Sequence, residues 1–102
     1  AQKAAAEVEY KTLVADADAA RNQGSYAAAI GLYKQALKRK DSTSVRERLG
    51  KAYNATGQHG KAGEQFRVCV KRLEARLEKT TDEAQRKQLQ GKIDLINRQI
   101  RD

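Results

Sequence analysis

The side chains best suited to chemistry at neutral pH are a single histidine, a single cysteine and a pair of nearby aspartates. His59 alone cannot form a paired-histidine zinc motif, and Cys69 alone excludes an internal disulfide and a cysteine-cluster metal site. Asp16 and Asp18 are two residues apart, so on a helix they do not face each other as a catalytic pair. The sequence holds no phosphate loop or nucleophile elbow. It therefore predicts a protein without enzymatic activity, metal or cofactor.

The pattern around the histidine and the cysteine indicates structural roles for both. Cys69 continues an apolar stripe with Phe66 and Leu73, so we expect a buried and unreactive thiol. His59 stands at the start of the same predicted helix, where we expect a structural or partly exposed imidazole. Neither residue is a candidate for catalysis.

Composition predicts a single all-α domain over residues 1–102. The chain has no proline, seven glycines, four tyrosines and one phenylalanine, which argues against the many turns of a sandwich or barrel. No window approaches the roughly 20 apolar residues of a membrane span. The chain begins Ala1-Gln2 rather than with methionine, as an excised domain or a processed chain would. Its compartment stays open between cytoplasm and periplasm.

Apolar side chains recur at helical spacing through most of the chain, and polar or glycine-containing segments separate the helices. Gly24 and Gly57 are suited to the left-handed conformation that ends a helix, and Ser25 to the N-cap of the next one. Residues 41–44 form the one polar cluster that predicts a longer loop.

Two capping boxes are predicted from a hydroxyl residue followed three positions later by glutamate. Ser44 with Glu47 would begin the third helix, and Thr80 with Glu83 would begin the last one. The apolar stripe that ends at Leu77 is out of phase with the apolar positions after it, so we expect a break near Thr80 rather than one continuous rod.

The sequence repeats itself with a period of 33 residues. Small residues align with small ones, rings with rings, and the two turn glycines coincide. Such a period is typical of stacked helix pairs, each too small to bury its own apolar face. The aligned pairs include Ala17 with Gly50, Gly24 with Gly57, Tyr26 with His59, Ala29 with Ala62, Tyr33 with Phe66, and Ala36 with Cys69.

Residues 10 to 75 resemble the tetratricopeptide repeat (TPR) family. The second copy reads Leu49-Gly50-x2-Tyr53 and then Ala62-x3-Phe66, with Gly57 in the turn; the first copy, with Ala29-x3-Tyr33, matches more loosely. The resemblance implies an α-α superhelix (solenoid) of two helix-turn-helix repeats, about 10–42 and 43–79. The pattern departs from the family at Arg46, where a tryptophan-like residue is usual, at Asp41 and Glu74, where proline is, and at Asp16, an apolar position.

The last segment, about residues 81–101, is expected to cap the stack as one helix. A degenerate third repeat is the alternative, because Gly91 lies 34 residues after Gly57 and Ile100 lies 34 after Phe66. The apolar residues of the two terminal segments could also overfill a small domain and leave a strip for self-association. These residues are Leu73, Leu77, Leu89, Ile93, Ile96 and Ile100.

The family resemblance implies a non-catalytic adaptor that binds a peptide or helix of another protein on its concave face. The family's carboxylate clamp is absent, because Val14, Asp18 and Arg48 occupy its positions. A plain solvated face with helical ion pairs, Glu7 with Lys11 and Glu47 with Lys51, is the competing interpretation. The predicted partner-binding residues are Lys11, Asp18, Arg21, Asn22, Lys51 and Asn54.

Positive charge is concentrated in the middle of the chain. The net charge is +8, and residues 44–79 carry 9 basic and 4 acidic side chains. Such a surface suits an acidic protein partner, with nucleic acid or anionic membrane as the alternative. Nucleic acid is the weaker choice, because the few aromatic rings occupy predicted core positions. The predicted basic patch comprises Arg46, Arg48, Arg67, Lys71, Arg72 and Arg76.

Overall fold

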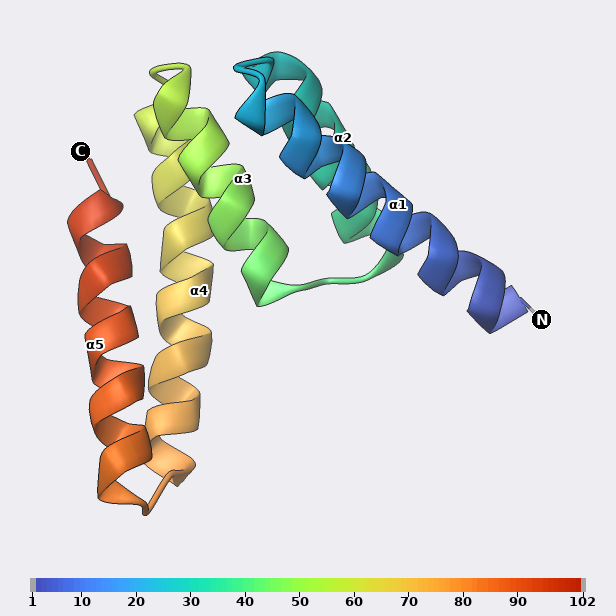
Figure 1. The fold of residues 1–102 in the computed structure, drawn as a ribbon. Helices are drawn as coiled ribbons and strands as arrows, with labels where there is room; N and C mark the ends of the chain where they lie inside the picture. Colours follow the sequence, from blue (N-terminus) through green and yellow to red (C-terminus); the bar gives the residue numbers. More distant parts are fainter. Residues whose placement is uncertain (1, 102) are drawn as a thin grey trace.

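A computed structural model describes residues 2–101, with side chains from residue 7 onward, so both ends of the predicted domain, residues 1 and 102, lie outside it. Over the described residues the chain is helical throughout, without strands, which confirms the all-α prediction. No helix among them is long and apolar enough to cross a membrane. The helices are α1 Gln2–Asn22, α2 Tyr26–Arg39, α3 Thr43–Ala55, α4 His59–Lys79 and α5 Glu83–Gln99 (Figure 1).

Each helix packs mainly on its neighbour in the chain. Two antiparallel hairpins, α1 with α2 and α3 with α4, follow one another, and α5 runs antiparallel along α4 (Figure 1). The extended connection from α2 to α3 joins the two hairpins, and the molecule measures 39 × 37 × 19 Å. Connections this short keep successive helices adjacent, as in helical-repeat proteins.

The two hairpins turn in the same way. Gly24 and Gly57 adopt φ of +81° and +79°, which glycine reaches without strain. In each turn the amide after the glycine donates to a carbonyl five residues back: Ser25 to Ala20 at 2.8 Å and Gln58 to Tyr53 at 2.9 Å. These are the bonds of a glycine-ended helix. Ser25 is the N-cap of α2 as expected, although its side chain makes no capping bond.

The two predicted capping boxes are wrong in position. The N-cap of α3 is Ser42, whose backbone is extended and whose Oγ accepts from the Val45 amide at 3.4 Å, so Ser44 already lies inside the helix. Thr80 ends α4 instead of beginning α5, and its hydroxyl donates to the Arg76 carbonyl at 2.6 Å. Asp82 caps α5 by accepting from the Ala84 amide at 3.0 Å. The predicted break near Thr80 is nevertheless confirmed.

The core uses equivalent residues of the two hairpins. Ala29 and Ala62, Tyr33 and Phe66, and Ala36 and Cys69 are all fully buried. Small residues allow close approach of the helices and large rings fill the space beside them.

The fifth helix completes this core. Ile93 and Ile96 are buried, and Leu77, Leu89 and Ile100 are partly buried against them. Ile93 and Ile96 are therefore packed inside the molecule, whereas Leu77, Leu89 and Ile100 stay partly exposed, and self-association through this strip stays a prediction. Gly91 lies within the unbroken helix α5, so this segment forms one helix rather than a third helix pair.

Candidate interaction surface

Asp18 joins three helices instead of lining an open groove. The Tyr33 hydroxyl donates to its Oδ1 at 2.5 Å, and Arg48 Nη1 donates to its Oδ2 at 2.9 Å. Burial, together with the bond to Asp18, raises the pKa of Tyr33 to about 12. Because Asp18, Tyr33 and Arg48 come from α1, α2 and α3, this network ties the first hairpin to the second.

Asn54 is also engaged within the chain. Its Nδ2 donates to the Gln99 carbonyl at 2.9 Å, which tethers the end of α3 to the end of α5. Its Oδ1 lies 2.8 Å from Nδ1 of His59, the first residue of α4. The histidine, half-buried, therefore helps to hold three helix ends together, in keeping with the structural role expected for it.

The other predicted partner-binding residues differ in exposure. Lys11, Asn22 and Lys51 are exposed, and Arg21 is half-buried. Lys51 Nζ lies 3.8 Å from Glu47 Oε1, as the helical spacing predicts. Glu7 does not pair with Lys11 as expected; its carboxylate lies 3.7 Å from Lys40 Nζ, on α2.

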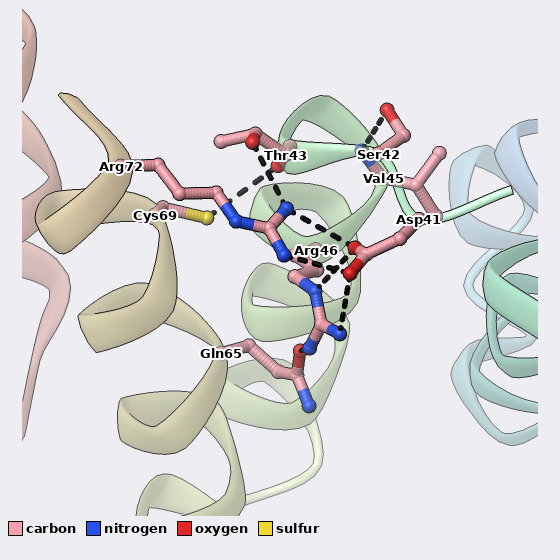
Figure 2. A network of polar contacts seen from close by, with 8 residues as sticks. All are labelled: Asp41, Ser42, Thr43, Val45, Arg46, Gln65, Cys69 and Arg72. Carbon is pink, nitrogen blue, oxygen red and sulfur yellow. Dashed lines mark hydrogen bonds and ion pairs between the residues drawn. The ribbon is translucent and has the colours of Figure 1, made fainter. Parts of the chain in front are cut away.

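Two residues of the predicted basic patch clamp one carboxylate (Figure 2). Arg46 Nε donates to Asp41 Oδ1 at 2.8 Å, and Arg72 Nη2 donates to Asp41 Oδ2 at 2.7 Å. Hydrogen bonds from Arg72 and then from Arg46 hold the pKa of Asp41 well below its usual range. Because Arg46 is on α3 and Arg72 on α4, the clamp fixes the α2–α3 connection to the second hairpin.

The cysteine lies under the same clamp. Cys69 Sγ is 3.4 Å from the Thr43 carbonyl, and Arg72 Nη1 donates to Thr43 Oγ1 at 3.2 Å (Figure 2). Burial raises the pKa of the Cys69 thiol to about 11. The predicted burial of Cys69 is confirmed, and a buried, protonated thiol is a poor nucleophile.

The predicted basic patch is therefore divided. Arg46 and Arg72 share the carboxylate of Asp41, and Arg48 pairs with Asp18. The remaining three, Arg67, Lys71 and Arg76, are exposed along α4.

The sequence alone did not reveal a crevice between α4 and α5. It encloses about 360 Å³, with an apolar floor and a polar rim. A signal was present, because Gln85, Gln88 and Lys92 recur at helical spacing beside Leu89 and mark one polar edge. The crevice is lined by Leu73, Arg76, Thr80, Gln85, Gln88, Leu89 and Lys92.

Within residues 2–101, no three histidine, cysteine, aspartate or glutamate side chains lie together as metal ligands. Comparisons of the chain with protein-family models, with curated proteins and with solved structures found no match.

Proposed function

We propose that this chain is a TPR-like helical-repeat domain that binds another protein and carries out no reaction. One observation carries the proposal: two turns 33 residues apart have the same glycine conformation and the same hydrogen bonds. Equivalent small and aromatic residues are buried behind both turns. A chain built by repeating one hairpin presents the outer faces of equivalent helices side by side, and such faces serve as extended docking surfaces.

The face that we assign to the partner is formed by α1 and α3. It carries exposed Lys11, Asn22 and Lys51, with Arg21 half-buried. Ammonium and amide groups can pair with acidic side chains and donate hydrogen bonds to an extended backbone. The net charge of +8 favours an acidic partner, because complementary charge speeds encounter and selects against basic proteins.

The experiment compares capture and direct binding by three versions of the domain. These are wild type, a Lys11→Glu/Lys51→Glu variant, and a Lys34→Glu/Lys38→Glu control that changes the same charge on exposed α2 positions. The expected result is a purified partner whose affinity falls at least tenfold with the α1/α3 variant and much less with the control. An equal loss of affinity with both variants would mean that net charge alone governs binding, and it would contradict the assigned face.

A salt titration with random oligonucleotides tests the rival function. Binding through phosphates falls steeply with salt, in proportion to the contacts made. We expect no micromolar binding at physiological salt, because Arg46, Arg48 and Arg72 of the patch are already held by carboxylates of this chain. Tight, steeply salt-dependent binding would favour nucleic acid over an acidic protein.

A further inference from the structure

The crevice between α4 and α5 lies where the helix α3 stops covering them. Helix α3 has 13 residues and α4 has 21, so at about 1.5 Å per residue α4 is longer by about 12 Å. Thr43, the first residue of α3, contacts Cys69 and Arg72. Residues of α4 after Arg72 therefore extend beyond α3, and Figure 1 shows this part of α4 accompanied by α5 alone. Helix α3 therefore covers only the first part of the α4–α5 hairpin, and no described helix continues its layer over the rest.

The uncovered crevice is apolar at its base and positive at its rim. Leu73 is buried and Leu89 half-buried, while Arg76 and Lys92 are exposed. Neither cation has an ion-pair partner within the described part of the chain, and no carboxylate lines the crevice. Leu95, one turn beyond Lys92, is 58% exposed and extends the apolar surface along the same helix face.

The acidic residues of α5 lie on the other side of the hairpin. Glu83 lines a smaller crevice there together with Leu77, Arg86, Lys87 and Gln90. Asp94 accepts a hydrogen bond from Gln90 at 3.0 Å, which places it on the same side. The lining of the larger crevice carries two cations and no carboxylate, whereas the smaller crevice combines Glu83 with Arg86 and Lys87, so the larger one is the more positive.

We propose that this crevice binds an acidic amphipathic helix of a partner protein. The helix would continue the layer of α3, place an apolar side chain over Leu73 and Leu89, and set carboxylates against Arg76 and Lys92. Helices bind apolar grooves through residues spaced three and four apart. The inference rests on the proposed protein-binding function and gives it a second site and a partner chemistry.

Charge and composition favour this occupant over two others. A second copy of the chain also carries a net charge of +8, so it would be repelled from a positive rim. A single-stranded nucleic acid needs aromatic faces on which bases stack, and the crevice has no aromatic lining residue.

The test uses a displayed library of 14-residue peptides selected on the immobilised domain. Every member has leucine at positions 4, 8 and 11, with the other positions drawn from glutamate, lysine, glutamine and alanine. Selected peptides are synthesised and titrated by fluorescence anisotropy against wild type, an Arg76→Glu/Lys92→Glu variant and the Lys11→Glu/Lys51→Glu variant of the α1/α3 face. A Lys87→Glu/Arg98→Glu variant, which changes the same charge on exposed residues of α5 outside the crevice, is the matched control. Circular dichroism confirms that each variant is folded.

The proposal expects glutamate-rich peptides whose affinity falls at least tenfold with Arg76→Glu/Lys92→Glu and less than threefold with the control. Amide shift changes in NMR spectra should lie within residues 73–80 and 85–95. Peptides that lose affinity only with Lys11→Glu/Lys51→Glu would overturn the crevice while supporting the proposed function. An absence of enriched peptides, or enrichment of lysine-rich ones, would overturn the crevice proposal; the partner measurements on the α1/α3 face then decide the proposed function separately.

Discussion

The sharpest test of the packing is the substitution Gly50→Ala in α3. A Cβ at this position would lie 2.7 Å from Cε1 and 2.8 Å from Cζ of Phe66. Phe66 is fully buried, so its ring has no open space into which it can withdraw. Alanine is otherwise the better helix former, by about 1 kcal/mol. The substitution therefore combines a stabilising effect, the higher helix propensity of alanine, with a destabilising one, the clash with Phe66.

The clash should prevail. Inserting a methyl group into a packed core costs about 1–3 kcal/mol, because neighbouring side chains must leave their preferred positions. After the helix gain is subtracted, we expect Gly50→Ala to lower the free energy of unfolding by about 1 kcal/mol. Gly31 in α2 and Gly91 in α5 are the controls, since a Cβ at either meets no atom within 4 Å. Alanine at either of those positions should raise the free energy of unfolding by about 0.5–1 kcal/mol.

Thermal and urea unfolding of the three single variants measure this contrast. For a domain of this size about 1 kcal/mol corresponds to a change in Tm of roughly 4–8 °C, so Gly50→Ala and Gly91→Ala should move Tm in opposite directions. A Gly50→Ala/Phe66→Leu double variant should lose less stability than the two single changes together, because leucine removes the ring that the methyl group meets. A rise in Tm for Gly50→Ala, equal to that of Gly91→Ala, would refute the close approach of α3 and α4.

Three further predictions concern the buried and clamped groups. Tyr33→Phe should lower the free energy of unfolding by about 1 kcal/mol, because it removes the hydrogen bond to the Asp18 carboxylate. The stability that the Tyr33 hydroxyl adds is complete below about pH 10 and is lost as the pH rises toward its folded pKa of about 12. Unfolding curves of the variant and of wild type should therefore converge at alkaline pH. Asp41→Asn should lower the free energy of unfolding by no more than about 1 kcal/mol at pH 7, because the carboxylate is half-exposed. Folding lowers the pKa of Asp41, so the stability that its carboxylate adds is present above about pH 4 and declines as the pH falls. The difference in stability from wild type should therefore shrink in urea titrations at acid pH. Cys69 should react with a thiol reagent such as DTNB only at the rate of unfolding, and rapid labelling of the native protein at pH 8 would contradict its burial and its raised pKa of about 11.

Much of the fold was predictable from the sequence because local signals and the repeat agree. Gly24 and Gly57 take the left-handed conformation that their positions after helical stripes predict. Apolar spacing identified the buried members of both hairpins, including Tyr33 and Phe66. The N-caps were misplaced by two residues, because Ser42 and Ser44, and likewise Thr80 and Asp82, all have side-chain oxygens that can cap a helix.

The candidate site was less predictable, because its charges are set by partners far away in the sequence. Arg48 pairs with Asp18 across 30 positions, and Arg72 pairs with Asp41 across 31. Helical spacing reports only neighbours three and four residues apart, so a run of basic residues looks like one free surface. The fold divides it into arginines that hold the hairpins together and cations that face solvent.

Of the exposed patch cations along α4, Arg76 lies nearest the end of the helix, where it lines the crevice. The carboxylate of Asp18, in the first hairpin, pairs with Arg48. The carboxylate of Asp41, in the α2–α3 connection, pairs with Arg46 and Arg72. Because α4 extends beyond α3, its last turns lie beside α5 and no described helix of the first half of the chain covers them (Figure 1). The acidic residues that α5 could supply, Glu83 and Asp94, face the opposite side. Unequal helix length therefore leaves the partly exposed Leu89 and the exposed Leu95 beside Arg76 and Lys92, and an acidic amphipathic partner would contact both the leucines and the cations.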